Sequence, residues 1–163
     1  MEKTRKVGIM DHLMAGLNKM IPFVVAGGIL MALGFAFAGV DAMNPPTGEN
    51  GSLGQILYTI GNTHAMGLMY IVISGFIAHS IGGPMALMAG MVGGSIAAGN
   101  GSTFLGAIIA GFLAGYIVKV LGQIKLPESL SAIAEILLIP VISAVLVGIA
   151  SIYLIGIPVA WLR

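Results

Sequence analysis

The chain has 163 residues, of which 58% are hydrophobic and only 8% are charged, and its formal net charge is +1. Soluble domains carry about 25% charged residues, so this chain has too few charged side chains to cover a folded surface in water, as its mean hydropathy of +1.04 also indicates. The composition predicts an all-α integral membrane protein without a nucleic-acid partner. A helix of about 20 residues crosses the hydrocarbon core of about 30 Å, so the length allows four or five crossings.

The first segment, residues 1–19, combines charged side chains with apolar residues at helical spacing. The apolar positions are Ile9, Met10, Leu13, Met14 and Leu17. A helix with such a stripe buries one face at a membrane surface and leaves the other face in water. Residues 1–19 are therefore predicted to form an interfacial amphipathic helix on the cytoplasmic side.

Residues 20–162 are predicted to form the transmembrane region, with about five transmembrane helices. The first crossing, Met20 to Val40, is bounded by charged residues and would span about 31 Å. The third, Pro84 to Ala98, would span only about 23 Å, so it either crosses as a short helix or turns back. The other predicted crossings are Ile56 to Ile81, Thr103 to Leu121 and Ile136 to Leu162.

The basic residues indicate whether the short third segment crosses. If it does, one side of the membrane holds Lys3, Arg5, Lys6, Lys19, Lys119 and Lys125, and the other side holds only Arg163. If it turns back, one side of the membrane holds five basic residues and the other side holds two. Because lysine and arginine accumulate in cytoplasmic segments, the first arrangement is favoured, with the N-terminus in the cytoplasm. The polar connector LGQIKLPESLSAIAE, which contains Lys125, would then follow the fourth crossing on the cytoplasmic side.

Small residues recur every four positions in the fourth predicted crossing. Ala107, Gly111 and Gly115 share one helix face, and Gly122 lies on the same face one heptad later. Small residues at this spacing let two helix backbones approach closely in a membrane. The pattern predicts a packing face, either against another helix of the same chain or against a second copy in a homodimer.

A polar cluster, Asn62, Thr63 and His64, lies inside the second predicted crossing. Polar groups are costly to bury in hydrocarbon and usually face a cavity or another polar group. One interpretation is that the three residues line the path of a solute. The alternative is that His64 lies near the helix end and meets interfacial water.

No recognised catalytic pattern is present. The sequence has no cysteine, no glycine-rich phosphate loop ending in Lys-Ser or Lys-Thr, no HExxH and no paired carboxylates within a crossing. His64 and His79 would lie at different depths and could not share a metal. We therefore expect no catalytic residue, no cofactor and no metal in this chain.

Three segments, in order, resemble the fructose-type enzyme IIC, or EIIC, the membrane component of the bacterial phosphotransferase system. DHLMAGLNKMIPFVVAGGILMALGFAFAG resembles its opening, GSTFLGAIIAGFLAGYIVKVL its fourth crossing, and LPESLSAIAEILLIPVISAVLVGIASIYLIGIPVA its connector and fifth crossing. The turn HSIGGPMA keeps the family's glycine and proline but lacks its charged residues. The resemblance implies that residues 1–163 are the N-terminal part of an EIIC transmembrane domain in the bacterial cell membrane.

The resemblance also implies a function. The EIIC would take up a hexose, fructose or a related sugar, coupled to its phosphorylation by the carriers EIIB and EIIA, so this chain would hold no catalytic or phosphorylated residue. The family's principal sugar-binding residues lie in the C-terminal half of the domain, so the expected partners are that half, EIIB and EIIA, membrane lipid and a second copy. We expect no transport by the 163 residues alone. Two other classes stay open: a small homo-oligomeric channel or gradient-driven transporter, and a structural subunit of a membrane assembly.

Overall fold

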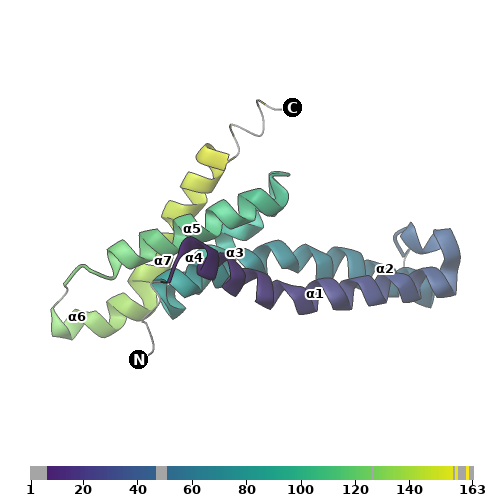
Figure 1. Ribbon diagram of the computed structural model, residues 1–163, viewed down its shortest axis with the longest axis horizontal. Coiled ribbons are helices and arrows are strands. Elements are labelled where there is room, and N and C mark those ends of the chain that lie inside the picture. The colour runs from purple at the N-terminus through teal and green to yellow at the C-terminus, as the bar shows by residue number, and fades with distance from the viewer. Residues whose placement is uncertain (1–6, 47–50, 126, 156, 158–160, 162–163) are drawn as a thin grey trace. The chain divides into compact units, whose positions relative to one another are not determined.

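The computed structural model describes residues 7–46, 51–125, 127–155, 157 and 161 (Figure 1). Within these ranges all regular structure is helical. The α-helices are α1 (Ile9–Ala38), α2 (Leu53–Thr59), α3 (Gly67–Gly82), α4 (Pro84–Gly99), α5 (Thr103–Leu121), α6 (Glu128–Ile133) and α7 (Ile139–Ala150). A short 3-10 helix, Gly39–Met43, follows α1, and there are three π-helical segments, Ile60–Met66, Ala134–Leu138 and Ser151–Ile155.

Four helical stretches are long and apolar enough to cross a membrane: Ile9–Met43, Leu53–Gly82, Thr103–Leu121 and Glu128–Leu154. Helix α4 is also apolar, but its 16 residues reach only about 24 Å. The predicted class, an all-α membrane protein, is confirmed, whereas the crossing by α4 stays a prediction. The predicted last crossing, Ile136 to Leu162, ends beyond the continuously described residues.

Helix α1 is one continuous helix, although the sequence suggested a separate segment up to residue 19. Its 30 residues extend about 45 Å, which is some 15 Å more than the hydrocarbon core needs. No glycine–proline turn separates the amphipathic stripe from the apolar run, and Pro22 is accommodated within the helix. The interfacial position of the first turns stays a prediction, and residues 1–6 lie outside the described part.

The described chain forms two compact units, one comprising Met20–Met69 and the other Met1–Lys19 with Tyr70–Arg163. In the first, α1 packs against α2 and the π-helical segment that follows it. A β-carbon at Gly61 would lie 2.6 Å from the Gly27 carbonyl oxygen, and one at Gly34 would lie 2.8 Å from that of Gly54. Glycine at these positions therefore permits backbone contact between the two antiparallel segments.

The second unit has Ser74 of α3 at its centre. Ser74 is fully buried, and its hydroxyl donates a 2.7 Å hydrogen bond to the Gly90 carbonyl oxygen of α4. Its own carbonyl oxygen lies between two glycines, because a β-carbon at Gly90 or at Gly111 of α5 would come within 2.7 Å of it. Helices α4 and α5 thus both contact the backbone of α3 near one residue. A tight turn at Gly83, with φ of 76°, connects α3 to α4.

The first turns of α1 and helix α7 complete this unit. A β-carbon at Gly16 of α1 would lie 2.7 Å from the Ile73 carbonyl oxygen, and His12 Nδ1 is 2.8 Å from the Ser80 hydroxyl at the end of α3. On α7, Val147 is fully buried and lies against Gly93 of α4. The core is therefore made mostly of glycine, alanine and serine, which lets the helices lie close together.

Adding one methyl group at Gly111 should destabilise the second unit. We expect Gly111→Ala to lower the free energy of unfolding by about 1–3 kcal/mol, because the new β-carbon would overlap the Ser74 carbonyl oxygen and the helices would have to separate. Thermal unfolding of the chain in detergent, followed by circular dichroism, measures the change.

Gly28→Ala is the matched control. Apart from the backbone of its own helix turn, no atom lies within 4 Å of a β-carbon there, and alanine favours the helix over glycine by up to about 1 kcal/mol. This variant should melt at the same temperature as the unmodified chain or higher. Equal melting temperatures for the Gly28 and Gly111 variants would contradict the packing described here.

Candidate functional site

The polar cluster lies in the π-helical segment Ile60–Met66. Asn62, Thr63 and His64 are all exposed, whereas the preceding Gly61 is buried against Gly27 of α1. The segment is thus fixed on one side by backbone contact and presents three polar side chains elsewhere. Single turns of π-helix often occur at functional sites, because the extra residue re-aims side chains and loosens the backbone hydrogen bonds.

The four residues of the predicted packing face on α5 differ in burial. Ala107, Gly111 and Gly115 are buried, and a β-carbon at Gly115 would lie 2.7 Å from Cβ of Ile81 on α3. In this structure α3 packs against Gly111 and Gly115, and the predicted homodimer stays a prediction. Gly122 is exposed and follows the end of α5, where a β-carbon would have only carbonyl oxygens of its own helix within 4 Å.

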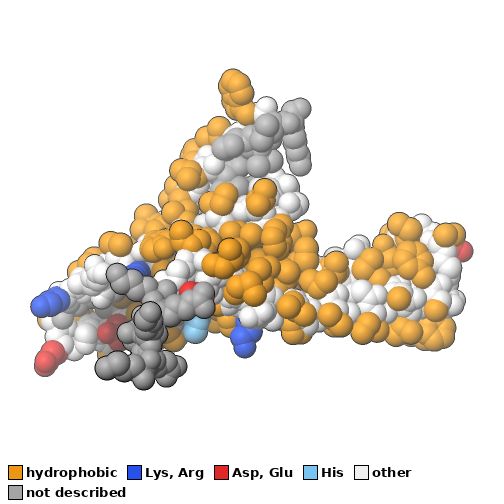
Figure 2. Space-filling model, viewed as in Figure 1, with side chains coloured by type: hydrophobic (Ala, Val, Ile, Leu, Met, Phe, Trp, Pro, Cys, Tyr) orange, Lys and Arg blue, Asp and Glu red, His pale blue; other side chains and the backbone are white. Residues whose placement is uncertain are grey.

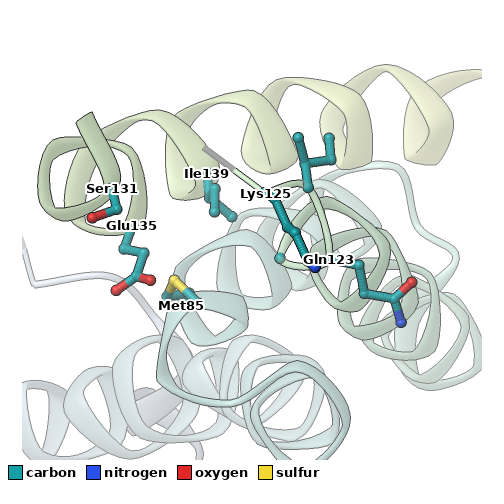
Figure 3. Close-up of a pocket in the computed structure, with 8 residues that line it drawn as sticks. Met85, Gln123, Lys125, Ser131, Glu135 and Ile139 are labelled. Carbon is teal, nitrogen blue, oxygen red and sulfur yellow. The ribbon is translucent and has the colours of Figure 1, made fainter. Parts of the chain in front are cut away.

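A polar pocket that the sequence analysis did not identify lies at the end of α5. We call it the connector pocket; its volume is about 350 Å³, and it is lined by Met85, Gly122, Gln123, Ile124, Lys125, Ser131, Glu135 and Ile139. Figure 3 shows Ser131 and Glu135 on one side of it and Lys125 and Gln123 on the other. The pocket therefore holds a cation and a carboxylate on opposite walls.

Local structure positions these polar groups. Helix α5 ends at Leu121, and the chain runs through the connector to α6, which begins at Glu128. The Ser131 hydroxyl donates to the Glu128 carbonyl oxygen at 2.9 Å. The π-helical segment Ala134–Leu138 carries Glu135. The sequence showed only that the connector is polar, because bringing Glu135 back toward Lys125 depends on the reversal of the chain between α5 and α6.

The described residues contain no group of three or more His, Asp or Glu side chains that could hold a metal ion. The groups in the connector pocket are instead hydrogen-bond donors and acceptors with one charge of each sign. Such a set can bind and orient a polar ligand.

The four long apolar helices define the chain as part of a polytopic helical membrane protein. The family model described as "Phosphotransferase system, EIIC" matches residues 14–163. The chain therefore belongs to the EIIC family of the phosphotransferase system, which confirms the resemblance found in the sequence.

Curated relatives agree with this assignment. The chain is 48% identical over 159 residues to the fructose-specific EIIB'BC component of Escherichia coli (strain K12), covering 97% of this chain and 27% of that protein. It is 38% identical over 151 residues to the fructose-specific EIIABC component of Bacillus subtilis (strain 168), covering 91% of this chain and 24% of that protein.

A third relative is named as an EIIC component alone. It is the fructose-specific EIIC component of Haloferax volcanii, 32% identical over 170 residues, which cover 93% of this chain and 45% of that protein. The chain thus spans about a quarter of the first two relatives and less than half of the third. No solved structure gives a significant match.

Proposed function

We propose that this chain is the membrane-embedded N-terminal part of a fructose-type sugar permease that takes up a hexose coupled to its phosphorylation by EIIB. The match of residues 14–163 to EIIC carries the proposal. Two of the relatives are named EIIB'BC and EIIABC, which supports EIIB and EIIA as partners. Phosphorylation adds roughly two negative charges to the sugar at pH 7. These charges oppose its return through an apolar barrier, so uptake becomes one-way.

The cluster Asn62–His64 is proposed to line the sugar path. Asn62 lies nine residues after the start of α2 at Leu53, about 14 Å along the helix axis, which is well inside a hydrocarbon core of about 30 Å if α2 begins at its boundary. Lipid chains cannot satisfy exposed polar groups at that depth. An amide, a hydroxyl and a neutral imidazole can each donate and accept hydrogen bonds, which suits a sugar hydroxyl.

The N-terminus and the connector are proposed to lie in the cytoplasm. Lys19, Lys119 and Lys125 are exposed, and their side chains are the described part of the basic set that favours this orientation. Lys3, Arg5, Lys6 and Arg163 lie outside the described residues.

The proposal is tested by exchanging homologous segments. Residues 1–163 would replace the matching segment of the Escherichia coli EIIB'BC component, to which the chain is 48% identical. In cells without their own fructose uptake system, we expect this chimera to restore accumulation of radiolabelled fructose phosphate that depends on phosphoenolpyruvate. Membrane insertion, measured by immunoblotting, is the control for expression.

The alternatives give different results. A gradient-driven transporter would accumulate unphosphorylated fructose without phosphoenolpyruvate, and a channel would conduct ions in liposomes. A structural subunit would give a correctly inserted chimera with neither activity. Any of these outcomes would contradict the proposed function.

Within the active chimera, Asn62→Ala and His64→Ala should each raise the KM for fructose by roughly two- to tenfold, which is the loss of about one hydrogen bond. Initial uptake rates over a range of fructose concentrations measure the effect. Ser95→Ala is the control, because Ser95 is an exposed polar residue of α4 outside the cluster. An unchanged KM in both cluster variants, at normal membrane insertion, would exclude the cluster from the sugar path.

The orientation can be tested directly because the chain has no cysteine. A membrane-impermeant maleimide should label Ser52→Cys in intact cells, whereas Gln123→Cys should be labelled only after permeabilisation. Both positions are exposed, so a difference reports the side of the membrane. Labelling of the variant at position 123 from outside intact cells would contradict the proposed cytoplasmic position of the connector.

A further inference from the structure

An apolar groove is lined by residues of α5 and α7. The groove has a volume of about 360 Å³ and is lined by Leu113, Tyr116, Ile117, Val120, Leu121 and Leu146. On α5, Leu121 lines the groove and the next residue, Gly122, lines the connector pocket. On α7, Leu146 lines the groove and Ile139 lines the pocket, and residues seven apart share a helix face. The linings of the two cavities therefore meet in sequence at Leu121 and Gly122.

The length of α5 indicates the depth at which the groove and the connector pocket lie in a membrane. Helix α5 has 19 residues and extends about 28 Å, which is close to the thickness of the hydrocarbon core. Its end at Leu121 then lies at the boundary, with the groove at the depth of acyl chains and the connector pocket at the depth of headgroups. In Figure 2, charged side chains gather at the α6 end of the molecule, and a hydrophobic surface lies beside them.

The charges in the connector pocket select the headgroup. The Lys125 ammonium can donate to a phosphate, and the Glu135 carboxylate on the opposite wall can accept from a primary ammonium (Figure 3). A free sugar phosphate would offer no apolar part to fill the groove, and an anionic lipid would offer no cation to Glu135.

We propose that the connector pocket and the apolar groove together bind one molecule of phosphatidylethanolamine. The phosphate lies against Lys125, the ammonium lies against Glu135, and an acyl chain lies along the groove between α5 and α7. This inference rests on the membrane location of the chain and goes beyond the proposed sugar transport.

Native mass spectrometry of the purified chain tests the proposal with three probes that share dioleoyl chains: phosphatidylethanolamine, phosphatidylcholine and phosphatidylglycerol. Phosphatidylethanolamine should bind about tenfold more tightly than either of the others, because each of them lacks one charge-assisted hydrogen bond. The choline headgroup has no N–H donor, and the glycerol headgroup has no cation.

Two pairs of variants show whether the pocket is responsible. Lys125→Gln combined with Glu135→Gln should abolish the tenfold preference. Lys119→Gln combined with Glu128→Gln should preserve it, because these residues are also exposed but line neither cavity. Circular dichroism verifies that both pairs keep the helical content of the unmodified chain.

Three results would overturn the proposal: equal affinity for the three lipids, a preference that survives in the Lys125 and Glu135 variant, or displacement of the lipid by fructose 1-phosphate or by a second copy of the chain. Glycerophosphoethanolamine, which has the headgroup without acyl chains, should not compete at the same concentration. Because the assay measures no transport, a negative result leaves the proposed sugar uptake intact, and an inactive chimera leaves the lipid site intact.

Discussion

The contact between the backbones of α3, α4 and α5 at Ser74 is the constraint on which the second unit depends. Three polar or small positions meet there: the Ser74 hydroxyl donates to the Gly90 carbonyl oxygen, and Gly90 and Gly111 leave no room for a β-carbon beside the Ser74 carbonyl oxygen. Hydrophobic burial does not drive helices together within lipid, so association depends on close packing and hydrogen bonds. This contact therefore holds α4 and α5 close to the backbone of α3.

Much of the helical arrangement could be predicted from the sequence, because a run of apolar residues bounded by charges has few alternatives in a membrane. The predicted crossing Thr103 to Leu121 coincides with α5. The partner of its small-residue face could not be predicted, since the same four-residue spacing serves α3 or a second copy equally well. The π-helical conformation around Asn62–His64 could not be predicted either. A π-helix differs from an α-helix in which backbone groups hydrogen-bond, and the amino-acid composition does not show that difference.

The two polar sites lie in different units of the structure. The side chains of Asn62–His64 are exposed in the first unit. The connector pocket is built within the second unit from residues of α4, α6 and α7, the segment that follows α5, and the π-helical segment Ala134–Leu138. The family match covers residues 14–163, and the residues that line the connector pocket all belong to the second unit.

The glycine-lined seams also restrict how such a protein can diverge. At Gly90, Gly94 and Gly111 a substitution of any kind adds atoms where a neighbouring backbone already lies, so a genetic change there is damaging whichever amino acid results. The outward apolar positions, by contrast, accept one aliphatic side chain for another at little cost. Over evolutionary time, neutral drift in this bundle should collect on its outer surface, while the helix–helix contacts remain nearly fixed.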